Sequence, residues 1–200
     1  MSRFTETSGG PQFTFPYGDP GDIAVCGDWN GDGIATPGVF RDGRWLIRNS
    51  ISPGYADVVF GFGDRGDQPI VGDWNGDGRA DIGVFRSGSW YLRRFPTPAE
   101  RDVVADTTFA FGNPGDQPVA GRWTRGPARP AVFRDGVWYA RYSLTPGFAD
   151  VVWAFGDSGD EAFAGDWNAD GVDGPGVNRS PTWLLRNTNT NGPVDVTFAF

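Results

Sequence analysis

The chain has 200 residues, a formal net charge of −8, no histidine and a single cysteine. This length fits one domain with a buried core. The acidic balance argues against nucleic acid or an anionic membrane surface as a partner, and the lone Cys26 excludes an internal disulfide. We expect Cys26 to be buried as a small apolar residue.

Residues 1–12 are expected to form an N-terminal tail. The sequence after Met1 has no apolar core of a signal peptide, and no stretch is long and apolar enough to cross a membrane. If the natural protein is exported, we interpret this chain as a mature or excised domain.

Two columns of tryptophan divide the rest of the chain into four copies, because a fixed period in this range is typical of repeat architectures. One column lies at Trp29, Trp74, Trp123 and Trp167, and the other at Trp45, Trp90, Trp138 and Trp183. The second copy contains four β-type segments, at 69–72, 82–86, 90–93 and 103–111, separated by turn residues. The link Ser87-Gly88 has the length of a tight hairpin. No window has helical periodicity.

These features predict an all-β fold, a β-propeller of four-stranded antiparallel blades. The expected blades span about 17–62, 63–111, 112–155 and 156–200 within one domain, 13–200. An aromatic-x-Phe motif of the outer strand occurs five times, so 13–16 is left as a spare outer strand that could close the ring. We favour a closed ring of four blades. The alternative is a segment of a larger propeller.

The first segment of each copy is followed by a loop, and in the second copy the loop is rich in oxygen ligands. Counted from Asp73, side-chain oxygens stand at positions 1, 3, 5 and 9, and Gly78 stands at position 6, where the chain must turn sharply. Position 7 would offer its backbone carbonyl. This spacing is typical of calcium loops. The predicted ligands are Asp73, Asn75, Asp77, Arg79 and Asp81.

The first and fourth copies repeat this pattern with fewer acids in ligand positions. The predicted ligands are Asp28, Asn30, Asp32, Ile34 and Thr36 in the first copy, and Asp166, Asn168, Asp170 and Val172 in the fourth. We expect about three structural Ca²⁺ ions, bound most tightly by the second loop. They would reduce the net charge from −8 to −2. A turn rich in Asp, Asn and Gly without metal is the alternative.

The third copy has lost this loop, since Arg122 occupies position 1 and no carboxylate follows up to Arg129. We expect no ion there. Either the Arg122 guanidinium partly replaces the ion by hydrogen-bonding nearby backbone carbonyls, or the loop needs no ion.

The segment from Phe62 through Asp73-Trp74-Asn75-Gly76-Asp77-Gly78 to Gly83-Val84-Phe85-Arg86 and Trp90-Tyr91-Leu92 resembles the bacterial FG-GAP/VCBS-type repeat. That repeat is akin to the blades of integrin α-chain propellers. The resemblance covers nearly the whole chain from Phe13. It implies calcium between the first and second strands of a blade, an extracellular or cell-surface location, and roles in adhesion or ligand binding.

Three further columns recur in all copies. An Asp lies between successive blades, at Asp22, Asp67, Asp116 and Asp160, and we expect it to fix a turn. One Arg column follows the second segment, at Arg41, Arg86, Arg134 and Arg179. The other follows the third segment, at Arg48, Arg93, Arg141 and Arg186. We interpret both Arg columns as structural, with stems over Trp faces and heads on the Asp turns. An anion-binding ring is the alternative.

The eight periodic Trp side chains are expected to pack between blades. Exposed aromatic residues that bind a ligand are better sought in the variable loops between third and fourth segments. The candidates are Tyr55, Phe95, Tyr142 and Phe148.

An enzyme is disfavoured, because there is no histidine for acid–base work and the acids recur with the repeat. We therefore expect a calcium-stabilised, non-catalytic binding or adhesion module of an exported bacterial protein that presents loops to a glycan or protein ligand. The alternatives are a self-assembly module that exchanges its spare strand, and an accessory domain of a secreted cell-wall hydrolase. The chain would be a monomer or a strand-exchanged homo-oligomer.

Overall fold

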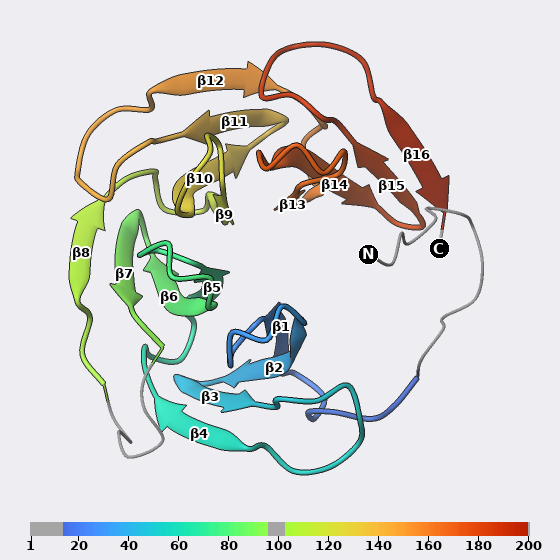
Figure 1. Ribbon diagram of the computed structural model, residues 1–200. Coiled ribbons are helices and arrows are strands. Elements are labelled where there is room, and N and C mark those ends of the chain that lie inside the picture. The colour runs from blue at the N-terminus through green and yellow to red at the C-terminus, as the bar shows by residue number, and fades with distance from the viewer. Residues whose placement is uncertain (1–13, 96–102, 200) are drawn as a thin grey trace.

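The computed structural model describes residues 14–95 and 103–199, and within these ranges the regular structure consists entirely of strands (Figure 1). There are four groups of four strands. They are β1 (Ile23–Gly27), β2 (Thr36–Arg41), β3 (Arg44–Ile47) and β4 (Val58–Gly61); β5 (Gln68–Gly72), β6 (Asp81–Arg86), β7 (Ser89–Arg93) and β8 (Thr107–Ala110); β9 (Gln117–Gly121), β10 (Arg129–Arg134), β11 (Val137–Ala140) and β12 (Val151–Ala154); β13 (Glu161–Gly165), β14 (Gly174–Arg179), β15 (Thr182–Leu185) and β16 (Val196–Ala199).

Each group forms one antiparallel sheet in chain order, and we number these sheets blade 1 to blade 4. The blades stand around a common centre with β1, β5, β9 and β13 innermost and β4, β8, β12 and β16 outermost (Figure 1). The predicted all-β propeller of four-stranded blades is therefore confirmed.

Two-residue turns join the second and third strands in blades 1 to 3. In blade 1 both turn residues have a positive φ, 47° at Asp42 and 86° at Gly43. A pair of positive φ values matches the twist of the two strands that the turn connects. Glycine is required at its second position because a Cβ on Gly43 would lie 2.4 Å from the carbonyl oxygen of Gly63. The same turn recurs at Ser87-Gly88 and Asp135-Gly136.

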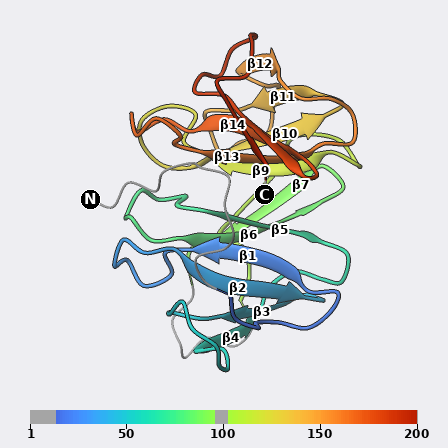
Figure 2. The ribbon, with the colours of Figure 1, turned by 90° about the vertical axis from the view of Figure 1, so that its right-hand side faces the viewer.

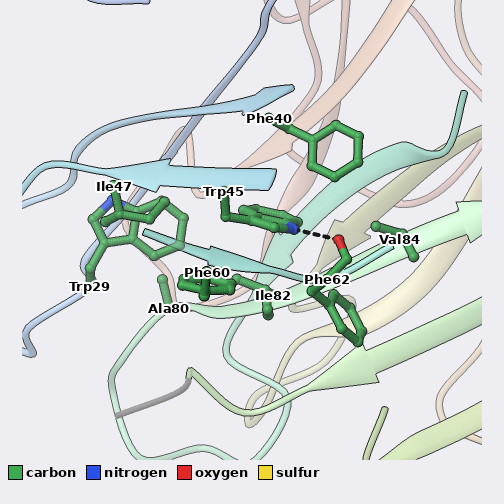
Figure 3. Packing of buried hydrophobic residues seen from close by; sticks show 9 residues of the cluster. All are labelled: Trp29, Phe40, Trp45, Ile47, Phe60, Phe62, Ala80, Ile82 and Val84. Carbon is green, nitrogen blue, oxygen red and sulfur yellow. Dashed lines mark hydrogen bonds between the residues drawn. The ribbon is translucent and has the colours of Figure 1, made fainter. Parts of the chain in front are cut away.

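The core lies between successive blades rather than within them (Figure 3). Trp29, Trp45 and Phe60 of blade 1 pack against Ala80 and Ile82 of blade 2. Trp45 is fully buried, and its indole N–H donates a 2.9 Å hydrogen bond to the carbonyl of Phe62. The pattern recurs between blades 2 and 3 and between blades 3 and 4. Each blade thus covers the aromatic face of the blade before it.

Blade 4 builds its aromatic face differently. Asn178 occupies the position of the buried Phe40, Phe85 and Phe133 in the other blades, as its pairing with Trp183 shows. Phe163 fills this space instead, and its ring meets Trp183 edge-on with centroids 4.9 Å apart. It fits because its partner across the sheet is Gly176, where a Cβ would lie 2.3 Å from the Phe163 ring.

The described residues leave the ring open between blade 4 and blade 1, so they do not form the closed ring favoured from the sequence (Figure 1). Innermost strands pack side by side at β1–β5, β5–β9 and β9–β13, while the described residues form no comparable packing between β13 and β1. Cys26 of β1 is exposed, which overturns its predicted burial, because no blade covers this side of β1. Every described sheet is complete within its own repeat. Residues 14–16 of the predicted spare strand form no strand, and Phe13 lies outside the described residues.

Antiparallel order sends alternate connections to opposite ends of the propeller. The loops after the first and third strands of each blade therefore share one end, which we call the loop face. Figure 2 shows the loop between β1 and β2 projecting from the left side of the ring. The β2–β3 hairpins and the crossings between blades lie at the other end, which we call the turn face. The part of the chain that the structure describes contains no helix able to span a membrane.

Candidate metal-binding loops

The loop between β5 and β6 is held together by its own acidic side chains. Asp73 Oδ1 accepts the backbone N–H groups of Gly76 and Asp77 at 2.6 and 3.2 Å, and its Oδ2 accepts the N–H of Gly78 at 2.9 Å. Asn75 Oδ1 accepts the Asp77 N–H at 2.8 Å, and Asp77 Oδ1 accepts the Arg79 N–H at 2.9 Å. These bonds wrap the backbone around the side-chain oxygens of positions 1, 3 and 5.

The loops of blades 1 and 4 share this hydrogen-bond pattern. The position-1 carboxylate accepts the N–H of position 6 at 2.7 Å in the Asp28 loop and at 2.9 Å in the Asp166 loop. The position-5 carboxylates, Asp32 and Asp170, each accept the N–H of position 7 at 2.8 Å. Because position 6 has φ near 87° in all three loops, it needs glycine, found at Gly33, Gly78 and Gly171.

The position-5 acids of blades 2 and 4 have lowered pKa values, which favours their ionised form. Hydrogen bonds from the Arg79 N–H and the Asn75 amide lower the pKa of Asp77. In blade 4, hydrogen bonds from the Asn168 amide and the Val172 N–H lower the pKa of Asp170. Carboxylates that accept one hydrogen bond per oxygen keep a free lone pair on each oxygen. Such a carboxylate suits a hard cation.

Position 9 differs from the expectation for a simple cage. Asp81 is only 1% exposed, and its two oxygens accept the N–H groups of Trp74 at 3.1 Å and Phe95 at 2.8 Å. Burial is the main cause that raises the pKa of Asp81 to about 6, and the charges of Asp77 and Asp73 raise it further. Its counterpart Thr36 is also buried. Both side chains turn inward, and a place for them in a cation's shell stays a prediction.

At position 7, the N–H groups of Ile34, Arg79 and Val172 are bonded to the position-5 acids, and a ligand role for their carbonyls stays a prediction. In the described residues, no three Asp, Glu, His or Cys side chains gather closely enough to hold a metal by themselves. The donor set predicted for each loop is instead two carboxylates, one Asn amide oxygen and a backbone carbonyl. Oxygen donors of this mixed kind fit Ca²⁺.

A hollow of about 270 Å³ opens beside the blade-2 loop, where Asn75 and Asp77 face Arg94 and Phe95. Arg79 crosses its floor, because Nε and a terminal nitrogen both donate to the Trp29 carbonyl of blade 1, at 3.2 and 2.6 Å. The hollow therefore joins the candidate metal loop to the junction of blades 1 and 2.

In the third loop, the positive charge is supplied by the Arg122 side chain. Arg122 lies next to blade 4, with a terminal nitrogen 3.3 Å from Asp173 Oδ1 and 3.7 Å from Asp166 Oδ2. The hypothesis that its guanidinium bonds backbone carbonyls is wrong: its side-chain partners are the acids of the neighbouring loop. Asp173 is the acid at position 8 of the blade-4 loop, and both of its carboxylate oxygens accept hydrogen bonds from Arg122.

The second Arg column was predicted to contact the Asp turns, and this prediction is wrong. Its side chains instead form hydrogen bonds within the loop face. Arg48 donates to the carbonyls of Ser52, Pro53 and Tyr55 at 2.6 to 2.9 Å. Arg141 and Arg186 fold into their own loops in the same way. Arg93 instead pairs with Asp106 at 2.6 Å, in the blade whose loop is longer.

An acid that sequence reasoning missed closes each of these loops. Asp57 Oδ2 accepts the N–H of Asn49 at 2.8 Å, and Asp106, Asp150 and Asp195 do the same in their blades. The signal was present in the sequence, since the clamping Arg and this Asp stand nine residues apart in blades 1, 3 and 4.

The predicted exposed aromatics divide into two groups. Tyr55 and Phe148 are 95% and 94% exposed, and Tyr142 is 44% exposed, which confirms their expected exposure. Phe95 is different, because its ring packs against Trp29 and Phe60 with centroids 5.5 and 5.8 Å away. Its predicted place among the exposed rings is therefore wrong.

The first Arg column has the predicted structural role on the turn face. Arg86 donates to both oxygens of the buried Asp67, at 2.6 and 2.8 Å, and Asp67 Oδ2 accepts the N–H of Asp64. The pairs Arg41–Asp22, Arg134–Asp116 and Arg179–Asp160 repeat this bidentate arrangement. These guanidinium groups are thus used within the fold, which favours the structural interpretation over an anion-binding ring.

Comparison with known proteins adds no family to this description. No protein-family model matches the chain, and a search of curated proteins finds no significant similarity. The resemblance to the FG-GAP/VCBS-type repeat therefore remains an expectation based on the residues alone. The four-bladed architecture is shown by the structure.

Proposed function

We propose that this chain is a calcium-stabilised, non-catalytic β-propeller module of an exported bacterial protein, whose loop face binds a glycan or protein. One observation supports the calcium most strongly. Three loops, after β1, β5 and β13, have the same hydrogen-bonded arrangement of Asp, Asn and Asp around a glycine with positive φ. A turn that served only to reverse the chain would have no need of the same three oxygen ligands each time.

Calcium would stabilise the propeller by linking groups that otherwise repel each other. Asp73 and Asp77 lie on one short, exposed loop, and the same holds for Asp28 with Asp32. An ion with a dissociation constant near 10⁻⁴ to 10⁻³ M, the range of extracellular modules, would add about 1.4 to 2.7 kcal/mol per site at 10 mM calcium. A site with such a dissociation constant fills at millimolar calcium, as calcium sites of extracellular modules do.

The proposed binding role places the ligand on the loop face. The turn face uses its recurring charges in Arg–Asp pairs, whereas the loop face offers the candidate ions and the exposed rings of Tyr55 and Phe148. Binding residues often lie on loops held by a rigid scaffold.

The experiment is thermal unfolding of the whole chain in calcium, in magnesium and in chelator. We expect calcium to raise the melting temperature by several degrees in millimolar concentrations, and magnesium to act much more weakly because it demands a smaller octahedral shell. Equal melting temperatures in calcium and in chelator would refute the calcium part of the proposal.

A second candidate function, self-assembly, is favoured by the open side of the ring. Ala24 and Cys26 of β1 are both exposed, and because they lie two residues apart they share the side of the strand that faces the opening. Across the opening, Trp183 of blade 4 is only partly buried, whereas its counterparts in the other blades are fully buried. The blade-4 face of one copy could pack against β1 and β2 of another.

Light scattering over a range of concentrations tests this, and a monomer at every concentration would refute it. Loss of oligomers on deletion of residues 1–16 would assign the assembly to strand exchange.

A further inference from the structure

Two loops on the loop face have nearly the same sequence and the same internal structure. In blade 1 the loop is Ser50-Ile51-Ser52-Pro53-Gly54-Tyr55-Ala56-Asp57, and in blade 3 it is Ser143-Leu144-Thr145-Pro146-Gly147-Phe148-Ala149-Asp150. Each ends in the acid that closes the loop, and each carries one aromatic residue at the same position. Blade 4 has Pro193 at that position, so the aromatic tip is a feature of blades 1 and 3 alone among these three loops of equal length.

A network of hydrogen bonds from one Arg side chain fixes each loop from within. Arg48 Nε and NH1 donate to the carbonyls of Ser52 and Tyr55 at 2.6 Å each, and NH2 donates to the Ser52 hydroxyl at 2.8 Å. Gly54 is essential to this contact, since a Cβ there would lie 2.8 Å from the guanidinium. Arg141 makes the same set of bonds in blade 3, to Thr145, Pro146 and Phe148. In each loop the backbone carbonyl of the aromatic residue thus accepts a hydrogen bond from the Arg side chain.

The rings themselves contribute nothing to the core. Tyr55 is 95% exposed and Phe148 is 94% exposed, while the backbone beneath each ring is held by a charged clamp. Exposing a large ring forgoes the favourable burial that folding offers to apolar surface. Because the Arg side chain already fixes the backbone beneath the ring, less conformational entropy of the loop is lost when a ligand binds.

We propose that Tyr55 and Phe148 are two equivalent contact points for a neutral polysaccharide. This inference rests on the proposed function, because it names the ligand class of the same loop face. The negative face of an aromatic ring attracts the C–H groups on one side of a pyranose.

The surroundings disfavour the other classes of ligand. A protein interface needs about 800 Å² on each partner and clusters its anchor residues at a desolvated centre. These rings instead belong to two separate loops, β3–β4 and β11–β12, which lie on opposite sides of the propeller (Figure 1). The net charge of −8 repels acidic polymers. A repeating neutral sugar chain can engage two like sites at once, and two linked contacts bind about 10²- to 10⁴-fold more tightly than one.

The test measures retention of the whole chain on insoluble cellulose and chitin, and its retardation in gels that contain β-1,3-glucan or α-mannan, all in millimolar calcium. We expect binding to at least one polymer. Tyr55→Ala or Phe148→Ala should weaken it by about tenfold or more, and the double variant should abolish it. Tyr55→Phe and Phe148→Tyr should bind like the original chain because they keep the ring. Val152→Ala is the matched control, an exposed apolar residue on the outer strand β12.

Each contrary outcome has its own meaning. Failure of the original chain to bind any of the four polymers overturns the inference, and so does unchanged binding in the double variant. Association between copies that is lost in Tyr55→Ala, without polymer binding, would assign the aromatic loops to a protein contact instead. The calcium-dependent melting temperature, measured on the same samples, reports on the proposed function separately, because both rings lie outside the metal loops.

Discussion

Arg122 of blade 3 and Asp173 of blade 4 are joined by three hydrogen bonds across the junction of two blades. The Arg122 N–H donates to Asp173 Oδ2 at 2.8 Å, its guanidinium donates to Oδ1 at 3.3 Å, and the Asp173 N–H donates to the Arg122 carbonyl at 2.9 Å. The last of these bonds recurs at the two preceding junctions, from Ala80 to Asp28 and from Ala128 to Asp73. The candidate metal loops thus also connect neighbouring blades.

Replacing the cation at this junction should strengthen calcium binding in the blade-4 loop. The Arg122 guanidinium lies 3.7 Å from the carboxylate of Asp166, the predicted position-1 ligand, so it would compete with a bound ion for that negative charge. We expect Arg122→Gln to tighten calcium binding by about three- to tenfold. Calorimetric titration measures this in a background with Asp32→Ala and Asp77→Ala, in which the blade-4 loop alone keeps its predicted ligands. Arg65→Gln, a substitution on the turn face, is the control. Unchanged or weaker binding in Arg122→Gln would contradict the expectation.

Removing a ligand from the blade-2 loop should separate a metal site from an ordinary turn. Asp77→Ala is expected to cost about 1 to 3 kcal/mol of stability in millimolar calcium, but only about 0.5 to 1 kcal/mol in chelator, where it removes a hydrogen-bond acceptor. Thermal unfolding in the two buffers measures the difference. The control Asp64→Ala, on the turn face, should lose the same amount in both. If Asp77→Ala does so as well, Asp77 is a turn residue.

In blade 4 a large residue, Phe163, faces a small one, Gly176, and we expect the effects of substituting the two on stability to be non-additive. Gly176→Ala would push a methyl group against the Phe163 ring, and Phe163→Val would leave a cavity, so each should cost about 1 to 3 kcal/mol. The double variant recreates the pair of Val119 and Ala131 that blade 3 uses. It should therefore lose clearly less than the sum of the two single costs in chemical unfolding. Simple additivity would mean that the two side chains do not compete for space.

Acid should weaken the Arg–Asp pairs of the turn face. The bidentate hydrogen bonds from Arg179 are the main cause that lowers the pKa of Asp160 below its ordinary 3.8. Because the pKa is lower in the folded state than in the unfolded one, this stabilisation is present above pH 3.8 and is lost as the pH falls through the folded pKa. Arg179→Met should lower the free energy of unfolding near neutral pH and flatten its decline in acid.

Urea unfolding between pH 2.5 and 7 provides this measurement, with Arg65→Met as the control. Arg65 is highly exposed and lies 3.7 Å from its nearest acid, so its loss should leave the acid dependence as it was. An equal decline in Arg179→Met and in the original chain would contradict the assignment.

Much of the fold could be predicted because its determinants are local or periodic. The strands expected at 69–72, 82–86 and 90–93 correspond to β5, β6 and β7 within one residue at each end. The Asp–Arg pairing of the turn face followed from two columns with a common period. The outer strand was placed less well: the expected 103–111 contains β8, which covers only 107–110.

The candidate site was predictable to the same extent. The bonds that shape the Asp73 loop join residues at most five apart, so the spacing of Asp, Asn and Gly contains the arrangement. Asp81 turns inward because the Phe95 N–H, 14 residues away, reaches its carboxylate. Phe95 is covered because Trp29 of the preceding blade lies against it. Neither contact has a signature in the local sequence.

The sequence by itself thus determined the repeat, the antiparallel blades and the inner geometry of the candidate calcium loops, since these depend on turn chemistry and on alternation along one short segment. Only the tertiary structure decided which charges meet across blades, as with Arg122 and Asp173, and which side chains remain exposed, as with Cys26 at the open side of the ring. The physical reason is that burial and ion pairing depend on the neighbour that the assembled ring provides, and this neighbour is about fifty residues distant in the chain for Arg122.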